Sequence, residues 1–159
     1  MKRIILLSLA ITMAFSACKK SEDYPKNSDG SITWISIDTA SKIANKDQKM
    51  FFIDFYTDWC GWCKKMDKST FEDPAVIDYM DKNFHNVKFN AEQKESVKFA
   101  GKEYQWQAGG RNGVNNLAVE YLRGNLGYPS FAILDKDYNL VKNIRGYKTP
   151  EQLLQELKQ

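Results

Sequence analysis

The order of apolar and polar residues along the chain predicts strands that alternate with helices. Residues 50–56 form an almost unbroken apolar run, which is typical of a strand buried on both faces of an α/β sheet. One carboxylate, Asp54, interrupts this run. Shorter apolar runs predict the remaining strands, and a polar segment at 135–137 predicts a hairpin turn between the last two. These strands are expected at 32–37, 86–90, 131–134 and 138–141.

Between these strands, apolar residues at helical spacing and typical capping residues predict helices. Asp38 is predicted to cap a first helix, and a second helix is expected to begin near Cys60. Asp73 before Pro74 and Thr149 before Pro150 are typical helix N-caps, and a further helix is expected at about 115–123. The resulting order is β-α-β-α-β, a long connection, and β-β-α. It predicts an α/β fold with a mixed sheet.

The amino terminus has the order of a bacterial export signal: basic residues, an apolar run, and small residues before Cys18. The run is shorter than the roughly 20 residues that a membrane-spanning helix needs. The position of Cys18 resembles the lipobox of bacterial lipoproteins, in which the cysteine is acylated; an ordinary cleaved signal with an incidental cysteine is the alternative. We expect a signal peptide at 1–17, a flexible tether with lipidated Cys18 at 18–30, and one folded domain at 31–159.

The charge balance argues against nucleic-acid binding. The 159 residues include 23 Lys and Arg against 20 Asp and Glu with the signs interspersed, so no basic stripe is present. Three Cys and one His are too few for a zinc site built from Cys and His unless nearly all of them converge. We expect no metal at the site. We also expect no other cofactor and a monomeric protein.

Cys60 and Cys63 form a Cys-x-x-Cys motif at the predicted start of a helix. Residues three apart share one helix face, which brings the two sulfurs close enough for a disulfide. Backbone N–H groups and the helix dipole would stabilise a thiolate at Cys60, the expected nucleophile in disulfide exchange. Cys63 would then resolve the mixed disulfide. A metal-binding pair and an inert structural disulfide are the alternatives.

The sequence resembles the thioredoxin superfamily in three segments, and the resemblance extends over about 32–159. The segments are Asp54-Phe-Tyr-Thr-Asp-Trp-Cys-Gly-Trp-Cys-Lys, Val87-Lys-Phe-Asn and Gly127-Tyr-Pro-Ser. The resemblance implies a thioredoxin-like fold, with a central mixed sheet flanked by helices. It also implies that Asp54 relays the proton of Cys63, that Lys88 is the charge partner of Asp54, and that a cis bond joins Tyr128 to Pro129 at the substrate site.

The residues themselves leave alternatives open. A carboxylate in an apolar strand is costly unless it is paired, and burial would raise its pKa towards a range suited to proton transfer. Asp54 could instead cap a neighbouring helix or face solvent, and Lys88 could stand exposed on its strand. Trp59 is expected mainly to pack at the rim of the site. Trp62 is expected to offer an exposed apolar contact to a protein substrate.

Two features depart from a typical thioredoxin. The residues between the cysteines are Gly61-Trp62 instead of Gly-Pro, which leaves the direction of the redox reaction open. The connection at 91–127 is long, and it could select partners near Pro129 or be a passive decoration. The motif and the residues after it are more similar to exported thioredoxin-like proteins and to the carboxyl-terminal domain of membrane thiol:disulfide interchange reductases.

The sequence therefore predicts an exported, lipid-anchored thiol:disulfide oxidoreductase that reduces protein disulfides in the cell envelope. Its partners would be protein thiols and disulfides and a membrane electron donor. The anchor is expected on the periplasmic side, in the outer membrane. Two alternatives stay open: a non-catalytic binding or chaperone module that uses Trp62, Trp106 and Tyr128, and a disulfide-forming oxidase with a higher reduction potential.

Overall fold

The computed structural model describes residues 27, 29–43 and 48–159. The predicted signal peptide, Cys18 and most of the predicted tether lie outside the described residues. Within the described part of the chain, no helix is long and apolar enough to cross a membrane.

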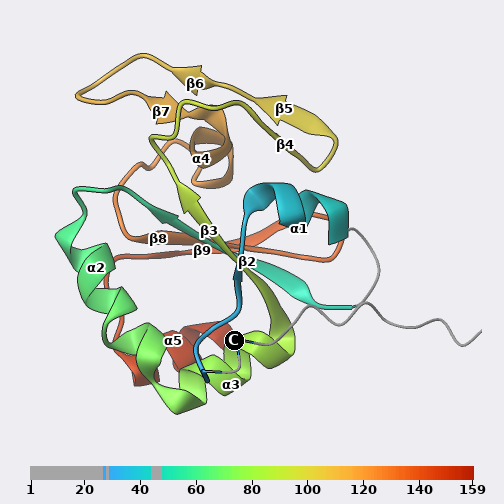
Figure 1. Cartoon of the computed structure of the whole chain (residues 1–159), viewed down its shortest axis with the longest axis vertical. Coiled ribbons are helices and arrows are strands. Elements are labelled where there is room, and N and C mark those ends of the chain that lie inside the picture. The colour runs from blue at the N-terminus through green and yellow to red at the C-terminus, as the bar shows by residue number, and fades with distance from the viewer. Residues whose placement is uncertain (1–26, 28, 44–47) are drawn as a thin grey trace, which may run out of the picture.

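A five-stranded mixed sheet forms the centre of the fold (Figure 1). Its strands lie in the order β1-β3-β2-β8-β9. β1 and β2 both run parallel to β3, whereas β8 is antiparallel to β2 and β9 to β8. The bounds are Trp34–Ile35 for β1, Met50–Tyr56 for β2, Phe84–Asn90 for β3, Ser130–Leu134 for β8 and Leu140–Arg145 for β9. The predicted α/β fold with a mixed sheet is confirmed.

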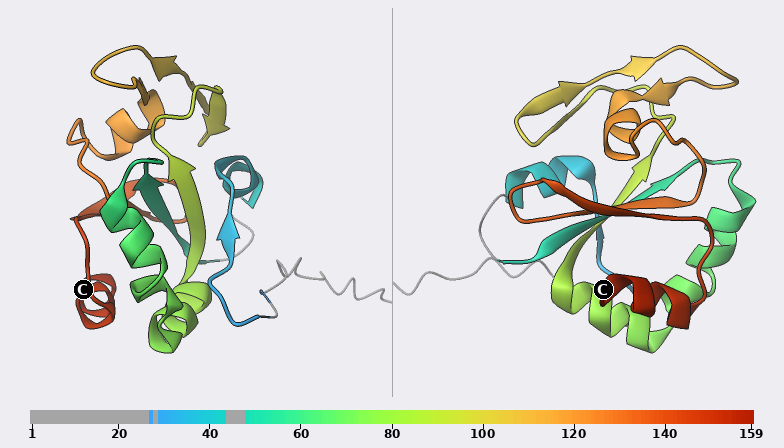
Figure 2. Two further views of the ribbon diagram at one scale, coloured as in Figure 1. Left: turned by 60° about the vertical axis from the view of Figure 1, so that its left-hand side comes forward. Right: turned by 180° about the vertical axis from the view of Figure 1, so that it is seen from behind.

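Helices cover both faces of the sheet (Figure 2). The helices α1 and α4 contribute to the core on one face, and α2, α3 and α5 to the core on the other. Because side chains alternate along a strand, β2 places Phe51, Ile53 and Phe55 in the first core and Phe52 in the second. The bounds are Ile37–Ile43 for α1, Gly61–Asp67 for α2, Pro74–Asn83 for α3, Asn116–Tyr121 for α4 and Pro150–Leu157 for α5.

The first helix begins earlier than its sequence pattern predicts. The backbone N–H of Thr39 donates to Ser36 Oγ at 3.1 Å, and the backbone N–H of Ala40 donates to the Ser36 carbonyl at 2.9 Å. Asp38 lies in the first turn of α1. The prediction that Asp38 caps this helix is therefore wrong, since Ser36 provides the capping oxygen.

The last strand lies two residues later than the segment predicted at 138–141. Asp135 Oδ1 accepts hydrogen bonds from the backbone N–H groups of Asp137 and Asn139, both at 2.9 Å. This carboxylate lengthens the turn through Asn139, so β9 starts at Leu140.

The insertion, residues 91–127, contains two short antiparallel hairpins followed by α4 (Figure 1). β4 (Val97–Phe99) pairs with β5 (Lys102–Tyr104), and β6 (Trp106–Gln107) pairs with β7 (Val114–Asn115). Val97, Phe99 and Tyr104 are buried in the first core. The insertion is thus part of the packed domain, because its own side chains contribute to the core.

Candidate active site

The two cysteines lie where β2 passes through a short turn into α2. Cys60 is the N-cap of α2, and its Sγ accepts a hydrogen bond from the backbone N–H of Cys63 at 3.1 Å. The two sulfurs form a disulfide, and both residues are nearly buried, with 3% of Cys60 and 4% of Cys63 exposed. The predicted placement of the pair at the start of a helix is confirmed.

Asp54 and Lys88 are register partners on the parallel strands β2 and β3. Asp54 is 1% exposed, and Lys88 Nζ lies 3.5 Å from its Oδ2. Asp54 projects from the same strand face as Phe52, which packs in the core that includes Met66 of α2. The carboxyl group therefore faces the layer that contains the cysteine helix, and it neither caps a helix nor faces solvent.

A second carboxylate shares this lysine. Asp67, the last residue of α2, accepts a hydrogen bond from Lys88 Nζ. Burial raises the pKa of Asp54 to about 7; the charge of Lys88 opposes this shift and the charge of Asp67 adds to it. No described residue donates a hydrogen bond to Asp54 Oδ1. Near neutral pH this carboxyl group can both hold and release a proton.

The predicted cis bond is present between Tyr128 and Pro129, just before β8. The turn is held from both sides, because Gly146 N–H donates to the Pro129 carbonyl at 2.9 Å and Ser130 Oγ donates to the Gly127 carbonyl at 2.6 Å. The ring of Tyr128 packs edge-on against Trp59, with 6.1 Å between the ring centroids. The residue before Pro129 thus meets the residue before Cys60.

These features have counterparts in a known family, since the model of a thioredoxin-like domain matches residues 37–159. The chain belongs to the thioredoxin-like domain family. Over 34 residues it is 50% identical to the thiol:disulfide interchange protein DsbD of Vibrio vulnificus, and over 48 residues 38% identical to protein disulfide-isomerase A3 of Gallus gallus. The matches cover 21% and 30% of this chain but only 6% and 10% of those relatives, so the chain corresponds to a small part of each.

A solved structure supports the same assignment over most of the chain. The solution structure of a proposed disulphide-isomerase from Bacteroides thetaiotaomicron is 26% identical, with a TM-score of 0.57. The similarity covers 80% of this chain and 88% of that one. The chain therefore has the fold and the cysteine pair of a thioredoxin-like disulfide oxidoreductase.

A tryptophan directly precedes each cysteine of this family member, and both tryptophans are largely exposed. Trp62 is 57% exposed; its ring lies 5.5 Å from that of Tyr147 and 4.8 Å from Lys65 Nζ. Trp59 is 59% exposed, and its indole N–H donates to Glu92 Oε1 at 2.8 Å. Trp59 thus packs against Tyr128 at the rim of the site, and more than half of the residue stays exposed.

Glu92 and Asp67 are site residues that the sequence analysis did not identify. For Glu92 a signal exists, because Trp59 and Glu92 follow the parallel strands β2 and β3 within three residues of the strand ends. The carboxyl ends of adjacent parallel strands emerge at one edge of a sheet, which brings the two residues together. For Asp67 the sequence holds no comparable signal, since its contact with Lys88 depends on the length and direction of α2.

The described residues contain no group of three or more His, Cys, Asp or Glu side chains that could hold a metal ion.

Proposed function

We propose that this chain is a thiol:disulfide oxidoreductase that reduces protein disulfides in the bacterial cell envelope. One observation carries the proposal: Cys60 caps α2, and its sulfur receives the N–H of Cys63. In the reduced protein, a backbone donor and the adjacent helix terminus favour a thiolate at Cys60. A thiolate at this position is the attacking species in disulfide exchange.

The proposed cycle has two exchange steps. The Cys60 thiolate attacks one sulfur of a substrate disulfide, so a mixed disulfide forms and the other substrate sulfur leaves as a thiolate. Cys63 then loses its proton to the Asp54 carboxylate and attacks Cys60 Sγ, which releases the second substrate thiol. The substrate gains two electrons, and the pair ends as the Cys60–Cys63 disulfide.

The residues around the pair support roles in proton transfer and substrate contact. A carboxyl group with a pKa of about 7 can accept the Cys63 proton and return it at neutral pH. Lys88 stabilises the charge that appears on Asp54 when it ionises. Trp62, Tyr128 and Pro129 would contact the substrate segment beside its cysteine.

The location in the envelope is supported by the amino-terminal sequence. The basic start, the apolar run and the cysteine after small residues fit an export signal with lipidation at Cys18. The charged residues after Cys18 begin with Lys19-Lys20, which favours the outer membrane as the site of the anchor. A membrane electron donor would return two electrons to the pair by thiol:disulfide interchange, the reaction for which the similar Vibrio vulnificus protein is named.

Three cysteine variants of the full-length chain test this proposal. With dithiothreitol as the electron source, Cys60→Ser should abolish the reduction of insulin disulfides. Cys63→Ser that has been reduced and then freed of dithiothreitol should accumulate a mixed disulfide with the substrate. Cys18→Ser is the matched control; it should retain the reductase activity of the purified protein and lose incorporation of labelled fatty acid in cells. Reductase activity that survives in Cys60→Ser would contradict the assigned nucleophile.

A further inference from the structure

A groove beside the cysteine pair has one wall made by the insertion. It encloses about 460 Å³ between the insertion loop, residues 108–113, and the side chains of Trp59, Leu126 and Tyr128. Trp59 precedes Cys60, and Tyr128 precedes the cis-proline. A polypeptide segment that presents its sulfur to Cys60 can therefore continue into this groove.

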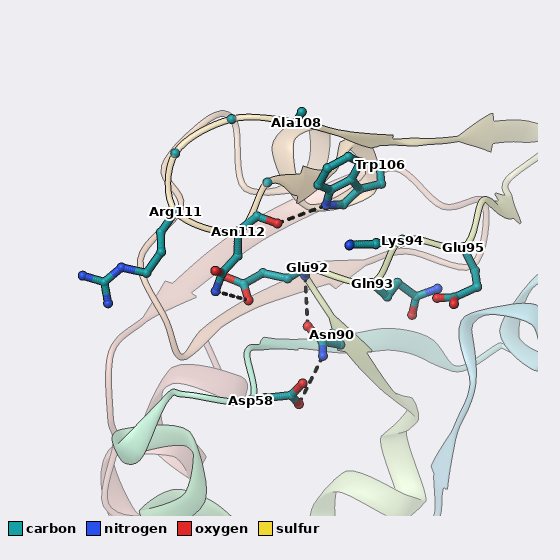
Figure 3. Close-up of a pocket in the computed structure, with 13 residues that line it drawn as sticks. Asp58, Asn90, Glu92, Gln93, Lys94, Glu95, Trp106, Ala108, Arg111 and Asn112 are labelled. Carbon is teal, nitrogen blue, oxygen red and sulfur yellow. Dashed lines mark hydrogen bonds between the residues drawn. The ribbon is translucent and has the colours of Figure 1, made fainter.

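Hydrogen bonds fix the insertion loop to the active site, and Figure 3 shows those that join Asn112 to Glu92 and to Trp106. The Glu92 carboxylate accepts from the Trp59 indole N–H at 2.8 Å and from Asn112 Nδ2 at 3.0 Å, one bond at each oxygen. The indole N–H of Trp106 donates to the Asn112 carbonyl at 3.3 Å. The loop and the active-site tryptophan thus form one connected wall that is in place before a partner binds.

The groove combines an apolar surface with an arginine, Arg111, that pairs with no carboxylate of the described residues. Trp59 and Leu126 are 59% and 38% exposed, and both line it. Two of the described residues that line it are charged, Glu92 and Arg111. Both oxygens of Glu92 are already hydrogen-bonded, whereas Arg111 is exposed at the loop tip, points away from Glu92 and forms no hydrogen bond or ion pair with another described residue (Figure 3).

We propose that this groove binds an extended segment of a protein substrate that carries an acidic side chain near the reacting cysteine. The acidic group pairs with Arg111, and an apolar neighbour rests on Trp59 and Leu126. This inference rests on the proposed function and adds a substrate class to it. The insertion is then a specificity element of the reaction, because the charge that selects the substrate lies outside the β2–α2 segment that holds the cysteines.

Synthetic peptides with a single cysteine test the proposal. The cysteine is blocked as a mixed disulfide with 2-nitro-5-thiobenzoate, and Glu, Gln or Lys is placed at each neighbouring position in turn. The reduced protein attacks the peptide sulfur through Cys60, which releases the coloured thiolate; Cys63 then displaces the peptide thiol. The rate of colour release is measured at low and high salt for each peptide.

The expected result is a preference for the Glu peptide over the Lys peptide at one or more positions, by about two- to fivefold at low salt and less at high salt. Arg111→Gln should remove the preference and Arg111→Glu should reverse it. Arg123→Gln, which removes an exposed charge of the same insertion outside the groove, should keep it.

Two outcomes would overturn the inference, and a free small disulfide identifies the reason. Equal rates for the Glu and Lys peptides, or a preference that persists in Arg111→Gln, would show that the groove does not select by charge while the redox activity stands. A reduced wild-type protein that cleaves neither the peptides nor 5,5′-dithiobis(2-nitrobenzoate) would overturn the proposed function, and the inference with it.

Discussion

The two sides of the cysteine pair are held by different kinds of interaction. On the sheet side, Asp54 is 1% exposed, and its position follows from strand register with Lys88. On the insertion side, Trp59 is 59% exposed and is fixed by a hydrogen bond to Glu92. The first arrangement places a carboxyl group where burial controls its protonation. The second places an aromatic ring where a partner can reach it.

In the proposed function, this difference separates the residues that control proton transfer from those that contact the substrate. A buried carboxyl group is sensitive to any neighbouring charge, because little water screens it. An exposed ion pair or hydrogen bond contributes little to stability and is easily exchanged for a contact with a partner. Substitutions on the sheet side should therefore alter pH dependence and proton transfer. Those on the insertion side should alter substrate choice.

The largest expected effect comes from Asp54→Asn. The pKa of Asp54 is raised from 3.8 to about 7 in the folded chain, so the folded protein holds a proton that the unfolded chain releases between these pH values. The wild-type protein should therefore lose stability as pH rises from about 4 to 7, by a total on the order of 4 kcal/mol. Asp54→Asn should remove this pH dependence, as measured by urea unfolding at several pH values in the oxidised state.

The same variant should slow the release of substrate from Cys60, because Cys63 loses its proposed proton acceptor. Stopped-flow measurements of mixed-disulfide decay would show this directly. A stability profile with the same slope between pH 4 and 7 in the variant and the wild type would contradict the assignment of a raised pKa to Asp54.

The next largest effect is expected in the insertion loop, from Gly113→Ala. Gly113 has a φ of +71°, and a Cβ there would lie 2.2 Å from the Trp106 ring. Strain and overlap should destabilise the folded chain by about 3 kcal/mol. Gly110→Ala is the matched control, because its φ is also positive at +54° but its Cβ would meet nothing within 4 Å; about 1 kcal/mol is expected. Urea unfolding measures both changes, and equal losses would contradict the role of the Trp106 contact.

The sequence predicts the sheet side of the site well, because its signals are local. A lone carboxylate in an apolar run, a Cys-x-x-Cys motif and the caps before two helices can each be recognised within a few residues. Asp73 Oδ1 does accept from Ala75 N–H and Val76 N–H at the start of α3, and Thr149 and Gln152 do form a capping box at α5. These local signals are sufficient to predict where the cysteine pair and Asp54 lie along the chain, without the tertiary structure.

The insertion side depends on contacts between distant residues, which no local pattern reports. Glu92 and Asn112 are 20 residues apart, and they meet only because two hairpins fold back over the end of β3. Trp59 is held in the same way, because its partners Glu92 and Tyr128 are distant from it in the sequence. Asp67 reaches Lys88 only through the length and direction of α2.

A smaller effect on the sheet side is expected from Asp67→Asn. The charge of Asp67 raises the pKa of Asp54 and its carboxylate binds Lys88, so removing that charge should lower the Asp54 pKa. Since the proposed base acts when it is ionised, the acidic limb of the pH–rate profile for Cys63 attack should move to lower pH. Asp58→Asn removes an exposed carboxylate that does not bind Lys88 and should leave the profile in place. An unchanged profile in Asp67→Asn would show that Asp67, which shares Lys88 with Asp54, does not influence the pKa of Asp54.

The smallest effect is expected from breaking the link between the loop and Trp59. Glu92→Ala should lose the hydrogen bonds to Trp59 and Asn112, each worth about 1 kcal/mol or less at a partly exposed site. The KM for a protein disulfide should rise severalfold, while the reduction rate of a small disulfide stays the same. A double-mutant cycle with Asn112→Ala measures the coupling, and strictly additive effects would argue against the link.

The direction of the reaction is the central claim, and the reduction potential of the Cys60–Cys63 pair tests it most directly. Equilibration of the purified protein with defined ratios of reduced and oxidised dithiothreitol or glutathione, followed by thiol alkylation, gives this potential. A reductant of protein disulfides should have a value near that of thioredoxin, about −270 mV. A reduction potential of about −120 mV, which is typical of a strong disulfide-forming oxidant, would contradict the proposed direction.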